Sequence, residues 1–208
     1  MPAENPTRSA LYSDISGTMH KLVLSIVLAA VTAQTKTIDT RKSSITIHVG
    51  KTGLFSAAGH DHWVSAPIAS GEIVDPGAQS VNFSVDAHKL KVKPDAKVKP
   101  EDEAQIQETM QQKVLESAMY PRIEFRSSSV TKAGAGSWRV TGQLTLHGVT
   151  KSVVVSVRQT GDAFSGDARI KQTDFGIQPI RVAGGAVKVK DELDIHFDVV
   201  AGPAGTAR

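Results

Sequence analysis

The chain has 208 residues, of which 40% are hydrophobic, 22% charged and only 5% aromatic, and it contains no cysteine. This composition is that of a globular protein and excludes collagen-like, disordered and disulfide-rich classes. A formal net charge of +3 without a block of like charges gives no support for nucleic-acid binding. The lack of cysteine excludes thiolate metal sites and a cysteine nucleophile.

The N-terminal region has the pattern of an export signal. After a basic start at Met19, residues 22–31 form an apolar run too short to span a bilayer, which needs about 20 residues. Small residues at Val31 and Ala33 predict cleavage after Ala33. A buried N-terminal strand or helix is the alternative interpretation of the apolar run. A translation start at Met19 explains the polar residues before it, and an extended n-region is the alternative explanation for them. We therefore expect a single periplasmic or secreted domain, residues 34–208, that does not span a membrane.

Alternation of apolar and polar residues, typical of half-buried strands, dominates the mature chain. In the last of these segments, residues 187–199, Asp191 is the single polar residue on the apolar face. Gly, Pro, Asn and Asp separate the segments, as hairpin connections require. The alternation covers residues 44–49, 81–87, 123–125, 138–146, 153–157 and 187–199.

One stretch has a helical period instead. Ile106, Met110, Val114 and Ala118 recur every four residues, and three acidic residues at 101–103 suit the first turn of a helix. The sequence predicts one amphipathic helix over residues 100–118. Several strands with one helix indicate a mostly β domain, either a closed barrel or a sandwich. Periodicity alone does not distinguish the two.

Three motifs resemble those of a known family. They are residues 119–127 (MYPRIEFRS), residues 140–151 (VTGQLTLHGVTK), and residues 174–177 (DFGI) with the strand at 189–199 behind them. Together they resemble the YceI-like family of secreted lipid-binding proteins, and the likeness runs from about Thr37 to Val200. The segments at 55–63 and 106–110 differ from the family's usual pattern.

The resemblance implies an extended, lipocalin-like antiparallel β-barrel of about eight strands with one helix at its side. It also implies a long apolar pocket that holds an amphiphile such as an isoprenoid chain or a quinone-like lipid. On this basis we expect a binding, transport or storage protein without a cofactor. No nucleophile motif or phosphate-binding glycine loop is present, so we do not expect an enzyme.

The segment His60-Asp61-His62 offers an alternative function. On a strand the two imidazoles would point the same way, so they could hold one metal ion in a metal carrier or a metal-dependent hydrolase. A third ligand would have to come from His48, His147, His196 or a carboxylate. The simpler interpretation is a polar turn whose histidines contact the backbone or a ligand head group.

A lipid pocket needs apolar walls with a few polar groups at its mouth. Any barrel core also requires large apolar side chains, so aromatic residues alone do not locate the pocket. The preferred candidates lie beside glycines and loops. The predicted ligand-binding residues are Phe55, His60, His62, Trp63, Phe175 and Ile177.

Overall fold

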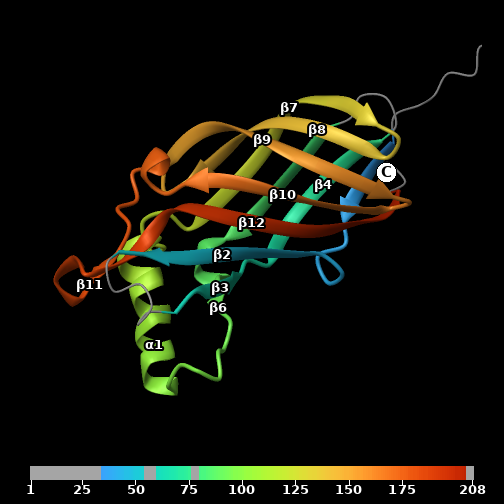
Figure 1. Ribbon diagram of the computed structural model, residues 1–208. Coiled ribbons are helices and arrows are strands. Elements are labelled where there is room, and N and C mark those ends of the chain that lie inside the picture. The colour runs from blue at the N-terminus through green and yellow to red at the C-terminus, as the bar shows by residue number, and fades with distance from the viewer. Residues whose placement is uncertain (1–33, 54–59, 76–79, 205–208) are drawn as a thin grey trace, which may run out of the picture. The chain divides into compact units, whose positions relative to one another are not determined.

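The computed structural model describes residues 34–53, 60–75 and 80–204, all within one compact unit, and shows mostly long antiparallel strands (Figure 1). The predicted start codon, signal peptide and cleavage site lie outside the described residues.

Eight strands form a closed antiparallel barrel, which confirms the predicted fold class. Strand β12 pairs with β10 on one side and returns to β1 on the other, which closes the wall. In spatial order the strands are β1 (Gln34–Ile38), β4 (Ile68–Asp75), β5 (Ser80–Asp86), β7 (Arg122–Gly134), β8 (Ser137–Leu146), β9 (Val149–Thr160), β10 (Ala163–Lys171) and β12 (Val187–Ala204).

Three strands extend the sheet beyond the barrel. Strand β2 (Ser44–Thr52) pairs with the first part of β12, and β3 (His62–Ser65) and β6 (Lys91–Val92) follow it outward. Because β2 takes most of that edge of β12, the pairing between β12 and β1 is short. It joins only Lys36 to Ala204 and Ile38 to Ala201, with an irregularity between them. The short strand β11 (Arg181–Val182) pairs with the beginning of β12.

The up-and-down order of the strands gives the barrel two different ends. At the hairpin end lie the connections β4–β5, β7–β8 and β9–β10, on the side of the C-terminal label in Figure 1. At the helix end lie the β8–β9 turn, the β10–β12 connection and the segment between β5 and β7 that contains α1. The β10–β12 connection includes two 3₁₀ turns, η4 (Thr173–Phe175) and η5 (Ala183–Gly185), and η2 (Ala87–Lys89) follows β5.

The predicted helix is present, but it ends earlier than expected, and polar contacts as well as apolar packing attach it to the rest of the protein. The α-helix α1 (Pro100–Thr109) continues into one π-helical turn, Met110–Val114, and stops four residues before Ala118. None of these residues is fully buried. Gln107 donates a hydrogen bond to the Leu90 carbonyl and accepts one from the Val92 N–H, so polar side chains hold much of the helix in place.

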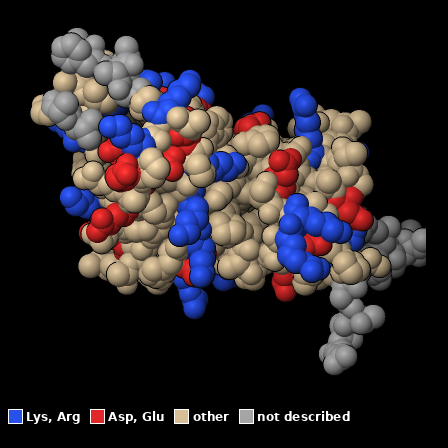
Figure 2. Space-filling model, turned by 90° about the horizontal axis from the view of Figure 1, so that it is seen from below, with Lys and Arg blue, Asp and Glu red and all other residues tan. Residues whose placement is uncertain are grey.

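No helix in the described part of the chain is long and apolar enough to cross a membrane. The face seen from below in Figure 2 carries Lys and Arg interspersed with Asp and Glu, without a large area of one sign. That face therefore offers no extended charged surface for recognising a polyanion.

Candidate ligand-binding site

The interior of the barrel contains an apolar cavity that is partly open to solvent. The space open to the centres of water molecules is about 160 Å³. Among the described residues that line it, none has a charged side chain. They are Ile38, Ile45, Ile73, Val74, Ser80, Val81, Phe83, Phe125, Val130, Trp138, Val140, Leu144, Val153, Val155, Val157, Gln159, Phe164, Ala168, Ile170, Ile195, Phe197 and Val199.

The few polar groups of the lining belong to the hairpin end. The Trp138 indole Nε1–H donates to Gln159 Oε1 at 3.0 Å, and Gln159 Nε2 donates to the Gly161 carbonyl at 3.3 Å. Ser80 begins β5 beside the β4–β5 connection, and its hydroxyl has no hydrogen-bond partner within the described residues. The cavity is thus apolar along its length, and the few polar, uncharged side chains that line it lie at one end.

Glycines that face the interior allow aromatic rings to lie close to the wall. A Cβ at Gly142 would overlap the Phe125 ring, and one at Gly166 would come within 2.7 Å of the Phe197 ring. The Phe125 ring also stacks on Phe83, with ring centroids 5.4 Å apart. The two glycines thus let the Phe125 and Phe197 rings lie close to the neighbouring strands.

The helix end, by contrast, is filled. Phe175 in η4 is only 1% exposed and Ile177 is 3% exposed, and both pack in the same buried cluster as Leu90, Leu115 and Leu146. Neither Phe175 nor Ile177 lines the cavity. Phe55 lies outside the described residues. A ligand role for these three residues stays a prediction.

The other three predicted residues lie on or beside β3. Trp63 is 48% exposed on the outer face, where its ring lies 4.7 Å from the His48 ring, centroid to centroid. His60 is exposed. His62 is half-buried, and burial, followed by the nearby charge of His60, lowers its pKa below 6.5. None of the three lines the interior cavity.

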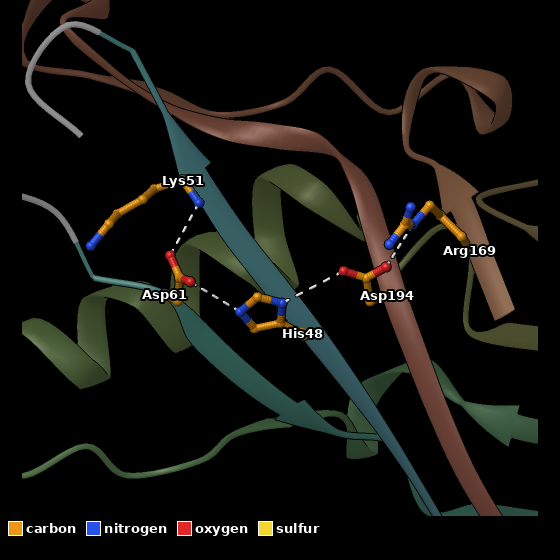
Figure 3. Close-up of polar contacts among 5 residues, drawn as sticks. All are labelled: His48, Lys51, Asp61, Arg169 and Asp194. Carbon is orange, nitrogen blue, oxygen red and sulfur yellow. Dashed lines mark hydrogen bonds and ion pairs between the residues drawn. The ribbon is translucent and has the colours of Figure 1, made fainter. Parts of the chain in front are cut away.

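The third member of the predicted polar motif, Asp61, joins a chain of polar contacts on the outer face (Figure 3). Asp61 Oδ2 lies 3.1 Å from His48 Nε2, and Asp61 Oδ1 accepts from the Lys51 backbone N–H at 3.2 Å. His48 Nδ1 lies 3.8 Å from Asp194 Oδ2, and Arg169 Nε donates to Asp194 Oδ1 at 2.6 Å. The contacts link β2, β10 and β12 to the residue before β3.

Both carboxylates of this chain are held in their charged form. Desolvation raises the pKa of Asp61, but the hydrogen bonds with His48 and the Lys51 backbone outweigh it, so the pKa is lowered overall. The hydrogen bond from Arg169 is the main cause that lowers the pKa of Asp194. Charged carboxylates on either side of an imidazole explain a stable connection between strands.

The metal hypothesis gains no third ligand from the structure. Within the described ranges, no group of three or more His, Cys, Asp or Glu side chains could hold a metal ion. His48 is bonded to Asp61, and His196 Nδ1 lies 2.7 Å from Asp167 Oδ1. His147 lies 2.6 Å from Glu116 at the β8–β9 turn.

That turn has a structural role. His147 and Gly148 both have positive φ, 51° and 74°, as a two-residue hairpin turn with inverted geometry requires. The Tyr120 ring lies against the His147 ring, with centroids 4.3 Å apart and the planes tilted by 52°, and it fills the space over Gly148. Glu116 also has a positive φ of 43°. These contacts fix the end of the helical segment to the β8–β9 turn.

Residues 36–201 match the model of the YceI-like domain. The chain belongs to the YceI-like family. Among curated relatives, a UPF0312 protein of Pseudomonas savastanoi is 34% identical over 96 residues, which are 41% of this chain and 48% of the relative. A UPF0312 protein of Azotobacter vinelandii is 36% identical over 74 residues, 31% of this chain and 38% of the relative. This chain spans about half the length of the curated relatives it matches.

Two solved structures share the fold of this chain. BcnA of Burkholderia cenocepacia gives a TM-score of 0.58 at 22% identity and covers 79% of this chain and 99% of its own. A polyisoprenoid binding domain from Saccharophagus degradans gives 0.55 at 14% identity and covers 84% of this chain and 100% of its own. At these identities the similarity establishes the barrel fold.

The cavity residues that sequence reasoning did not select could have been found from the strand alternation. Gln159 continues the inward face of Val153, Val155 and Val157 in β9, where a polar residue is unexpected. Ser80 gives no such signal, because the β5 alternation becomes evident only after it.

Proposed function

We propose that this protein binds a long apolar or amphiphilic molecule of the isoprenoid or quinone-like class inside its barrel, and carries or stores it without chemical change. The observation that carries the proposal is the apolar cavity inside the barrel, with no charged side chain among its described lining residues. The polyisoprenoid-binding domain of Saccharophagus degradans, which has the same fold, supports this ligand class.

The size of the cavity sets a limit on how a long chain can bind. An apolar cavity of about 150 Å³ holds one benzene ring. The 160 Å³ found here therefore takes about one five-carbon isoprene unit without rearrangement. A longer chain requires the barrel to widen or the rest of the chain to extend beyond the cavity.

The test is direct ligand binding by the mature chain, residues 34–208. Native mass spectrometry of the purified protein should show a bound lipid, and delipidated protein should bind geranylgeraniol or a short-chain ubiquinone with 1:1 stoichiometry. Protein that is always empty and has no affinity for these compounds would refute the proposal.

We also propose that the protein acts outside the cytoplasm, in the periplasm or after secretion. The apolar run at residues 22–31 supports this location. Cell fractionation of a C-terminally tagged full-length chain, followed by N-terminal sequencing, should give an exported form that begins at Gln34. A cytoplasmic protein with its N-terminus intact would contradict it.

A further inference from the structure

We infer that the ligand has an uncharged head group that binds to Gln159 and Ser80 at the hairpin end, with its apolar chain directed toward the helix end. The inference rests on the proposed function and specifies the class of ligand further. It favours an alcohol, a quinone or an amide over a diphosphate, a carboxylate or an amine.

The polar side chains at the hairpin end still have unused hydrogen-bonding capacity. A glutamine amide has two N–H donors and two acceptor lone pairs. Gln159 uses one lone pair for the Trp138 indole and one N–H for the Gly161 carbonyl, the latter at a long 3.3 Å. The Ser80 hydroxyl makes no hydrogen bond to any described residue. Together they offer donors and acceptors to a neutral head group.

The charge of the lining argues against an ionic head group. Moving an ion out of water is unfavourable unless an opposite charge meets it, and the described lining provides none. At the hairpin end of the barrel, the ammonium of Lys36 lies 2.8 Å from the Asp162 carboxylate, which already balances the charge of the lysine.

The distribution of apolar residues gives the direction of the chain. The polar lining residues Trp138, Gln159 and Ser80 lie near the hairpin end. The lining further toward the helix end, which includes Phe125, Leu144 and Ile170, is apolar. A chain directed that way meets only apolar side chains, and a head group placed there would lose its hydrogen bonds to water without replacement. The head group therefore belongs at the hairpin end.

The experiment compares compounds that share one C20 chain and differ in the head group. Dissociation constants are measured by isothermal titration calorimetry for geranylgeraniol, geranylgeranyl diphosphate, geranylgeranylamine and the hydrocarbon phytane. The delipidated mature protein should bind the alcohol at least tenfold more tightly than the diphosphate or the amine.

Two substitutions at one position test the contact. Gln159→Leu should weaken binding of the alcohol about five- to tenfold, the range of one neutral hydrogen bond, and leave phytane unchanged. Gln159→Glu still accepts from Trp138 but adds a negative charge, and it should reverse the preference so that the amine binds better than the alcohol. Gln143→Leu, the same change at an exposed position of β8, is the matched control and should have no effect.

The outcomes separate this inference from the proposed function. Equal or tighter binding of the diphosphate, or an unchanged alcohol-to-phytane ratio in Gln159→Leu, would overturn the inference while leaving a lipid-binding barrel. If none of the four compounds binds, the proposed function falls, and this inference with it.

Discussion

Substituting a phenylalanine for Ala168 should fill the cavity and abolish ligand binding. Ala168 lines the cavity from β10, between the inward-facing Gly166 and Ile170. Since a cavity of about 150 Å³ accommodates one benzene ring, the new side chain nearly fills the 160 Å³ present. The ligand then loses the site of about five carbon atoms, at about 0.8 kcal/mol each. The loss of about 4 kcal/mol of binding free energy corresponds to a roughly thousandfold larger dissociation constant.

The same substitution should not destabilise the unliganded protein. Filling a cavity of 160 Å³ should raise the free energy of unfolding by about 4 kcal/mol, at roughly 24 cal/mol per Å³. Strain from the added side chain should lower it by about 1–3 kcal/mol. We expect a gain of about 1–3 kcal/mol in the free energy of unfolding, measured by urea denaturation. Ligand affinity is measured by titration with geranylgeraniol.

Val154→Phe is the matched control, because Val154 is 54% exposed on the outer face of the neighbouring strand β9. It should leave both affinity and stability unchanged. A folded Ala168→Phe protein that binds geranylgeraniol as the wild type does would refute the placement of the ligand in this cavity. A loss of several kcal/mol of stability would show that the space is already filled.

Substitutions at three further positions test local features of the barrel. Gly142→Ala should lower the free energy of unfolding by about 1–3 kcal/mol in urea denaturation, because the new methyl group overlaps the Phe125 ring; no change would mean that the ring moves freely. At the β8–β9 turn, the His147→Val protein should be about 1–2 kcal/mol less stable to urea than the His147→Asn protein. Both variants lose the contact with Glu116, but only asparagine tolerates the positive φ of 51°. Equal stabilities would contradict a strained turn. The hydrogen bond with Asp167 raises the pKa of His196 in the folded protein. The pair therefore stabilises the fold fully at pH values below the unfolded pKa of His196, which is near 6.5. This stabilisation is lost as the pH rises through the higher pKa of the folded state. Asp167→Asn should therefore lower the melting temperature more at pH 5.5 than at pH 8.5, with an effect within about 1 kcal/mol because the pair is exposed; an equal effect at both pH values would exclude the linkage.

Alternation identified the strands that carry several large apolar residues on one face. Strands β9 and β12 have long runs of valine, isoleucine and leucine on one face, and the sequence predicted both. Strands β4 and β10 were not identified. Each has a glycine on its inward face. A Cβ at Gly71 would meet the Ile38 and Phe83 side chains, and one at Gly166 would meet the Ser156 carbonyl and the Phe197 ring. These glycines leave few large apolar residues on the inward faces of β4 and β10. Strand β8 also has an inward glycine, Gly142, but it keeps Trp138, Val140, Leu144 and Leu146 on that face and was predicted.

The helix and the cavity show two further limits of the sequence. The four-residue period predicted α1, but Gln107 makes contacts that a hydrophobic pattern does not reveal, and the helical segment ends before Ala118. The position of the cavity depends on how side-chain volumes from eight strands add up at each level of the barrel. Loop aromatic residues such as Phe175 are buried at the filled end, whereas mid-strand residues line the open space.

The short pairing between β1 and β12 has a mechanical consequence. The contact between β10 and β12 joins nine residue pairs, whereas the contact that closes the barrel joins two. Parting the wall at this seam breaks the fewest backbone hydrogen bonds, and both Ile38 and Val199 beside it line the cavity. A seam that opens sideways lets the circumference grow while the other seven strand contacts stay intact. The same barrel can then be narrow when empty and wide when it holds a chain of many isoprene units.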